Sequence, residues 1–246
     1  MSQPLSRRVF LALTGGALTG GALAGPSVSW PTDSEEDDEV PALLDHLIVG
    51  CRDLDRGIDF VEENTGVRPA IGGVHPGRGT RNALLSLGER RYLEIMAPDP
   101  AQSRIVHYPQ IREMNDPRLI GWAVHPADMA AIAKQLHESQ IAFQGPDDGS
   151  RKRPDGHVLT WRTVNLTDDR HGLLPFFIEW SADSMHPSKD APARCRLEYF
   201  EIMSADPEEL SSTFKRMGLD LPVERSDKAR LRALISGPKG DLRLST

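Results

Sequence analysis

The chain has 246 residues, of which 39% are hydrophobic and 26% are charged, and its formal net charge is −7. This length and composition predict a soluble globular protein with enough residues to bury a core. Its acidic balance, without a cluster of basic residues, argues against nucleic acids and anionic membrane surfaces as partners.

Residues 1–24 have the order of parts that is typical of an export signal. Arg7 and Arg8 precede a weakly apolar, glycine-rich run, and small residues suited to a signal peptidase follow at positions 22–24. This order resembles a twin-arginine signal peptide. It predicts export to the periplasm or the extracellular space by the twin-arginine translocase, with cleavage after Ala24. The alternative is a disordered N-terminus that contains two chance arginines.

The segment after this signal is strongly acidic. Residues 25–41 contain an uninterrupted polar run at positions 33–39, with no apolar side chains to bury. They are predicted to form a solvated linker. The apolar run before them is too short and too rich in glycine to span a bilayer stably, so no membrane insertion is expected after cleavage.

A repeated pattern organises residues 42–246. Three times, a short apolar strand is followed by an aspartate and then by a helix with one apolar face. The aspartates, each placed to cap the first helical turn, are Asp53, Asp128 and Asp206. Further strand-like runs follow each helix. The sequence therefore predicts an α+β fold of repeated strand–helix–strand–strand–strand modules, two paired into a cup and a third, incomplete one packed on them. The predicted modules span residues 42–100, 117–182 and 195–246.

Several runs, in this order and spacing, resemble the glyoxalase-like domain family of the vicinal-oxygen-chelate superfamily. They are residues 44–46 with 53–55, 75–82, 92–95, 121–123, 150–156 with 159 and 161–162, 174–180 and 186–187. The resemblance covers nearly all of residues 42–246 and implies the paired-module fold. It implies no single activity, because the superfamily includes isomerases, dioxygenases, epimerases, thiol transferases and drug-binding proteins.

The resemblance also implies where a metal would bind. In metal-dependent members, ligands come from the first and last strands of paired modules, and here those strands offer His46, Glu94 and Glu179. One imidazole and two carboxylates would suit one divalent metal ion that polarises a carbonyl or hydroxyl group. Glu94 and Glu179 would then be the catalytic carboxylates. Trp122 falls at the fourth ligand position, where its indole would fill much of the cup.

The same residues have a structural explanation. A lone histidine on an apolar strand is often a hydrogen-bonded core residue, and a buried carboxylate can be neutralised by an arginine. Arg153 and Arg162 are the candidate partners. The sequence leaves the metal site and the structural ion pair open.

A second set of residues is suited to binding a small molecule. The glycine-rich loop at residues 75–80 can bring backbone amides close to a ligand, although a purely structural turn would need the same glycines. The polar candidates there are His75, Thr80 and Asn82. Arg153, Trp161 and Trp180 are candidate pocket walls, since a guanidinium and indole faces suit a planar or carboxylated molecule, and Trp122 is a further candidate for ligand binding.

Two functions therefore remain open. One is a small-molecule isomerase or lyase of the glyoxalase type that uses His46, Glu94 and Glu179. The other is a binding module of the same fold without chemistry. The two cysteines, Cys51 and Cys195, are predicted to be buried thiols and not a disulfide, because neither lies in a paired-cysteine motif.

Overall fold

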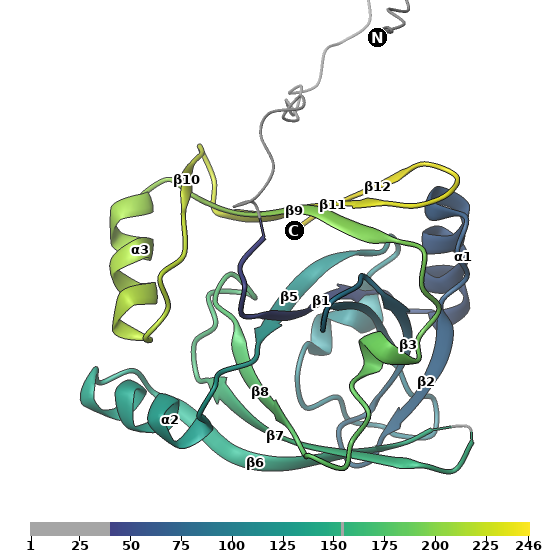
Figure 1. The fold of residues 1–246 in the computed structure, drawn as a ribbon, viewed down its shortest axis with the longest axis horizontal. Coiled ribbons are helices and arrows are strands. Elements are labelled where there is room, and N and C mark those ends of the chain that lie inside the picture. Colours follow the sequence, from purple (N-terminus) through teal and green to yellow (C-terminus); the bar gives the residue numbers. More distant parts are fainter. Residues whose placement is uncertain (1–39, 154) are drawn as a thin grey trace, which may run out of the picture. The chain divides into compact units, whose positions relative to one another are not determined.

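The computed structural model describes residues 40–153 and 155–246 (Figure 1). The predicted signal peptide, and the predicted linker up to residue 39, lie outside the described residues. Among the helices in the described part of the chain, none is long and apolar enough to cross a membrane.

The first two thirds of the described chain form a closed barrel of mixed strands in the order β1-β4-β3-β2-β6-β7-β8-β5. Its strands are β1 (Leu44–Gly50), β2 (Ala70–His75), β3 (Thr80–Ser86), β4 (Tyr92–Pro98), β5 (Arg118–Val124), β6 (Phe143–Lys152), β7 (Val158–Leu166) and β8 (Phe176–Trp180). β1 lies parallel to β4 and β5 lies parallel to β8, while β1 and β5 pair antiparallel. The predicted α+β class is confirmed, with a closed barrel in place of an open cup.

Two helices lie against the outside of this barrel, and both begin where the sequence predicts. α1 (Leu54–Thr65) is capped by Asp53, whose side chain accepts from the backbone N–H of Arg56 at 3.0 Å. α2 (Met129–Glu138) is capped in the same way by Asp128. α1 ends at Gly66, which takes the left-handed conformation that glycine adopts without strain. α1 contacts β3 and β4, and α2 contacts β6 and β8.

The remaining segment forms a separate four-stranded sheet in the order β10-β9-β11-β12 (Figure 1). Its elements are β9 (Arg196–Ser204), α3 (Pro207–Arg216), β10 (Glu224–Arg225), β11 (Arg230–Ser236) and β12 (Asp241–Ser245). Asp206 caps α3 as predicted. The pairing differs from that of the barrel halves, because β11 lies antiparallel to β9 and β12 pairs with β11. The last strand, β12, therefore lies at the edge of this sheet, whereas β4 lies beside the first strand of the barrel.

The main hydrophobic core lies between the outside of the barrel, the helices and this second sheet. It includes Leu47 and Trp122 from the barrel, Val61 from α1, Phe214 from α3 and Ile235 from β11. Cys51 and Cys195 are buried in it as free thiols, as predicted. Because this core covers the outer face, the inward face of the barrel is left to form its own interior.

A smaller apolar cluster fills one end of the barrel interior. The loop between β4 and β5, with a 3₁₀ helix at Pro109–Glu113, contributes to it. Its buried members are Ile48, Met96, Ile105, Ile111, Met114 and Ile120. The rest of the interior remains available for a cavity.

Candidate functional site

The barrel encloses a cavity of about 300 Å³. Side chains alternate along a strand, so every second residue of β1, β4 and β8 faces inward. The first half of the barrel, β1 to β4, contributes polar side chains to the lining, which include His46, His75, Asn82 and Glu94. The aromatic side chains of the lining include Tyr92, Tyr108, Trp161, Phe176 and Trp180. The second half of the barrel, β5 to β8, adds polar side chains that include Arg151, Asn165 and Asp169, so both halves contribute polar and aromatic groups to the lining.

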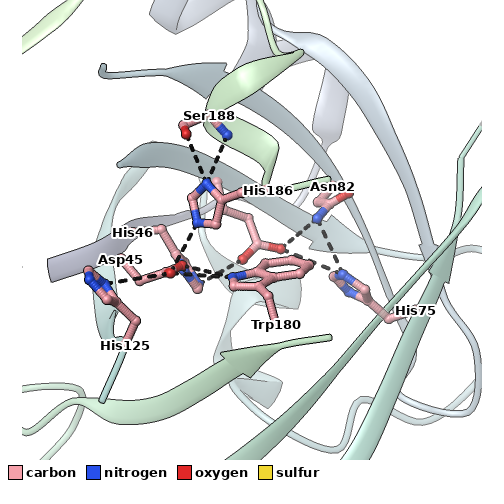
Figure 2. Close-up of polar contacts among 9 residues, drawn as sticks. Asp45, His46, His75, Asn82, His125, Trp180, His186 and Ser188 are labelled. Carbon is pink, nitrogen blue, oxygen red and sulfur yellow. Dashed lines mark hydrogen bonds and ion pairs between the residues drawn. The ribbon is translucent and has the colours of Figure 1, made fainter. Parts of the chain in front are cut away.

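A bulge in β1 brings two neighbouring polar residues to the same site. The register against β5 shifts between Leu44 and His46, which leaves Asp45 as the extra residue. Consecutive strand residues normally point to opposite faces, and a bulge redirects one of them. Asp45 is fully buried and accepts from His46 Nδ1 at 2.7 Å, His186 Nε2 at 3.1 Å and Trp180 Nε1 at 3.3 Å. Figure 2 shows these donors around its carboxylate.

This arrangement keeps Asp45 charged. Burial alone would raise the pKa of Asp45, but hydrogen bonds from His186 and His46 outweigh burial and hold that pKa well below its usual value. His186 Nδ1 accepts from the backbone N–H of Ser188 at 3.2 Å, so the proton on the ring is at Nε2, facing Asp45. The segment after β8 thus helps to hold the aspartate in place.

Asp45 in turn orients His46. Because His46 Nδ1 donates to Asp45, its Nε2 faces Glu94, with 3.5 Å between Nε2 and Oε2. The ring of His46 also stacks on Tyr92, with 4.5 Å between ring centroids. The imidazole is therefore fixed with one nitrogen directed into the cavity beside a carboxylate.

Glu94 is held from its other side by an amide. Asn82 Nδ2 donates to Glu94 Oε1 at 2.7 Å and lies 3.3 Å from His75 Nε2. Arg151 Nη1 donates to Asn82 Oδ1 at 3.0 Å, which fixes the amide orientation because arginine only donates. Burial lowers the pKa of His75 and favours its neutral form. His75 Nε2 can then accept from Asn82 while Nδ1 donates to Thr80 Oγ1 at 2.8 Å.

The comparison with protein families identifies this barrel. Residues 44–218 match the model of the glyoxalase-like domain. The chain belongs to the glyoxalase-like domain family. Comparison with curated proteins found no match.

One solved structure shares the fold of this glyoxalase-like domain, and others align with part of the chain. A hypothetical protein from Staphylococcus aureus aligns over 82% of this chain and 84% of that chain, with 19% identity and a TM-score of 0.57. Methylmalonyl-CoA epimerase from Streptomyces coelicolor aligns over 58% of this chain and 96% of that chain, with 21% identity and a TM-score of 0.43. The epimerase from Mycobacterium tuberculosis aligns over 60% of this chain and 91% of that chain, with 18% identity and a TM-score of 0.40.

Most of the residues proposed from the sequence of the glyoxalase-like domain meet at the cavity. They are His46, His75, Thr80, Asn82, Glu94, Trp161 and Trp180. The proposed residues that lie elsewhere are Glu179, Trp122 and Arg153.

Glu179 is not part of the site with His46 and Glu94. The inward residues of β8 are Phe176, Ile178 and Trp180, so Glu179 lies on the outer face of the same strand. There it accepts from Arg162 Nε at 2.9 Å. Of the two alternatives that the sequence left open for Glu179, the ion pair with Arg162 is the one that forms, at a partly exposed position.

Trp122 does not enter the cavity of the glyoxalase-like domain. It is paired in register with Leu47 and is fully buried in the outer core, 5.0 Å from the ring of Phe200. Its Nε1 donates to the carbonyl of Leu173 at 3.1 Å. The expected obstruction of the cup is therefore absent, because the indole points to the opposite face of β5.

Arg153 also lies outside the cavity, where it forms ion pairs with Asp155 and Asp190. Arg151, on β6, lines the cavity, and the sequence analysis did not identify it. One signal could have located it. Gly72 lies on β2, and a Cβ added there would collide with Arg151 Nη1 and Asn82 Oδ1. A glycine inside a strand often marks such a close approach.

The donor set of the glyoxalase-like domain does not fit the predicted metal ion. The inward residues of β5 that pair with β1 are Gly121 and Ala123, and β8 offers apolar side chains. The second half thus supplies no ligand from these strands. Within residues 40–153 and 155–246, no group of three or more His, Cys, Asp or Glu side chains could hold a metal ion. Asn82 also turns its amide nitrogen, a donor, toward Glu94.

Proposed function

We propose that this glyoxalase-like protein is a small-molecule isomerase or lyase whose proton-transfer groups are Glu94 and His46. The observation that supports it is the alignment of Asp45, His46 and Glu94, of which His46 and Glu94 line the cavity. Two side chains that can accept and release protons lie 3.5 Å apart, and both line the ligand space. Positioned acid–base pairs of this kind contribute about 10²–10⁴-fold to a reaction rate.

Each residue has a distinct task in this proposal. Glu94 accepts a proton from a carbon or hydroxyl group of the ligand, and His46 Nε2 returns or receives a proton at the neighbouring atom. Asn82 holds Glu94 Oε1, which leaves Oε2 on the side of His46. Asp45 fixes the tautomer of His46 and stabilises the positive ring that forms when Nε2 takes a proton.

Solvent exchange tests this proposal without knowledge of the physiological substrate. The protein is incubated in heavy water with a panel of carbonyl compounds and 2-oxo acids, and deuterium incorporation is followed by NMR. Glu94→Gln should slow exchange by about 10²–10⁴-fold, and Glu179→Gln, on the outer face of the barrel, should not. Equal exchange in wild type and Glu94→Gln would contradict the proposed role of Glu94.

The alternative function is a binding module that performs no chemistry. It is favoured by the aromatic wall, where the rings of Trp161 and Trp180 lie 5.2 Å apart and both line the cavity. Such a surface binds planar molecules whether or not a reaction follows. Ligand binding that Glu94→Gln leaves unchanged, with no exchange for any compound of the panel, would favour this function.

We also propose that the protein is exported. The support is the order of parts in residues 1–24, which lie outside the described residues. Replacing Arg7 and Arg8 by lysine should leave unprocessed protein in the cytoplasm, as judged by fractionation and N-terminal sequencing. The exported wild-type protein should begin near Gly25. An intact Met1 on exported protein would be the opposite result.

A further inference from the structure

Arg151 is a buried cation in the wall of the cavity. It lies near the end of β6 and is 3% exposed. Its Nη1 donates to the neutral amide of Asn82 at 3.0 Å, while its Nε has no hydrogen-bond partner. It forms no ion pair with any residue in the described part of the chain. The protein therefore holds a guanidinium at the ligand space without a matching negative charge in contact with it.

This arrangement has an energetic cost that a ligand can remove. A buried charge is costly unless it is paired and hydrogen-bonded. Burial lowers the pKa of Arg151, while Tyr92 and Glu94 act in the opposite direction from a longer range. Arginine nevertheless stays protonated in proteins. An anion that enters the cavity would provide the missing pair.

The surrounding backbone makes room for this guanidinium. Gly72 on β2 has no side chain at the point where a Cβ would collide with Arg151 Nη1. At Gly73, where φ is 144°, a Cβ would first collide with the backbone carbonyl oxygen of Lys152 and would lie 3.1 Å from Arg151 Cγ. Gly72 thus clears the space that the guanidinium occupies, which is expected of a site with a defined position for this group.

We propose that Arg151 binds the carboxylate of a small organic acid with a planar or apolar body. Nη1 is engaged by Asn82 and Nε is fully buried, so Nη2 is the nitrogen that remains to donate a charge-assisted hydrogen bond to a carboxylate oxygen. Trp161 and Trp180 supply apolar surface for the body of the acid. A cavity of about 300 Å³ admits a molecule of this kind.

Carboxylate binding by Arg151 rests on the proposed function only in so far as the bound acid is also the substrate. Arg151 contacts Asn82, and Asn82 contacts Glu94, so an acid bound to Arg151 lies beside the proton-transfer pair. Binding of the carboxylate itself does not require chemistry. The two proposals can therefore fail separately.

Calorimetry with matched probes tests the anion site. The carboxylates are acetate, pyruvate and 3-phenylpropionate, the uncharged match is 3-phenylpropionamide, and inorganic phosphate is the second anion. Wild type should bind 3-phenylpropionate about tenfold to a hundredfold more tightly than the amide, because hydrogen bonds to charged groups are the strong ones. Arg151→Gln should lose this preference. Arg153→Gln, outside the cavity, should keep it.

Four results would overturn the anion site. They are equal affinity for acid and amide, an unchanged preference in Arg151→Gln, tighter binding of phosphate than of any carboxylate, and no binding of any of the three carboxylates. The thermal midpoint of Arg151→Gln should be no lower than that of wild type, because the variant removes an unmatched charge. A strongly lowered midpoint, or failure to fold, would show that Arg151 has a structural role through Asn82 and would also overturn the proposal.

Glu94→Gln separates this inference from the proposed function. If both hold, this variant keeps the preference for 3-phenylpropionate over its amide and loses solvent exchange. Exchange that persists in Glu94→Gln contradicts the proposed chemistry and leaves the anion site intact. A preference that persists in Arg151→Gln contradicts the anion site and leaves the chemistry intact.

Discussion

Replacing Asp45 by asparagine tests whether this carboxylate holds the site together. Asp45 is fully buried and accepts from His46, His186 and Trp180. Asparagine keeps the shape of the side chain, but it has no charge and replaces one acceptor oxygen by an NH₂ donor. That donor would face one of the N–H groups that the carboxylate now satisfies.

The expected loss of stability follows from these contacts. A hydrogen bond to a charged group contributes about 1.5–3 kcal/mol, and a buried donor without a partner costs about 1–3 kcal/mol. Losing one such bond at Asp45 and leaving its donor unsatisfied should therefore lower the free energy of unfolding by about 3–5 kcal/mol. This is a large part of the roughly 5–15 kcal/mol that stabilises a typical domain.

The loss should also depend on pH. The pKa of Asp45 in the folded protein lies below its ordinary value of 3.8, so the folded protein binds fewer protons than the unfolded chain in acid. Its stabilising contribution is complete above that value and is lost as the pH falls below it. The difference in free energy of unfolding between wild type and Asp45→Asn should be constant near neutrality. Below about pH 4 this difference should decrease, by at most about 1.4 kcal/mol per pH unit.

Urea unfolding followed by tryptophan fluorescence measures both effects. Asp55→Asn, at an exposed position in the first turn of α1, is the matched control and should change stability by no more than about 0.5 kcal/mol. A loss below about 1 kcal/mol for Asp45→Asn would refute the structural argument. So would a difference that stays constant down to the lowest pH at which the protein remains folded.

Three further predictions concern other parts of the molecule. Glu179→Gln removes only the partly exposed pair with Arg162, so thermal unfolding should show a loss below about 1 kcal/mol, and a larger loss would indicate a buried role. Chelator treatment should not change the thermal midpoint, because the donor set is incomplete, and a clear drop would indicate a bound metal. Burial raises the pKa of Cys51 to about 12 and also raises that of Cys195, so a disulfide reagent at about pH 8 should label neither thiol until the protein is unfolded. Rapid labelling of the native protein would contradict this burial.

The helices could be predicted from the sequence because their signals are local. Asp53, Asp128 and Asp206 each precede apolar residues at three- and four-residue steps, and each caps a helix in the structure. A capping side chain contacts an N–H group only two or three residues away. Neither the rest of the fold nor the site has to be known to place such a contact.

The third unit could not be placed in this way. Its strand–helix pattern resembles the first two, and Asp206 caps α3 as predicted. The pairing of β11 with β9 is decided by contacts between residues far apart in sequence. A pattern of apolar residues predicts that strands form, but it does not predict which strands pair with one another.

The error at Glu179 has a different cause. Glu94 and Glu179 both lie in apolar runs, and period-two alternation should separate the inward carboxylate from the outward one. In β8, however, Phe176, Phe177 and Ile178 are all apolar, because the inner face lines the cavity and the outer face joins the main core. When a strand is apolar on both faces, its sequence does not indicate which residues point inward. An error of one residue in this assignment exchanges the two faces.

The two halves of the barrel have separate chemical properties. If both halves carried equivalent inward residues, β5 would offer polar groups opposite His46, but it offers Ala123 and Gly121. The absence of a side chain at Gly121 is used by Tyr108, whose hydroxyl oxygen occupies the space that a Cβ would need. At these two positions of β5, the second half therefore supplies no polar side chain opposite His46. Proton-transfer groups on one half and a guanidinium with aromatic surface on the other are what a site for a small organic acid requires.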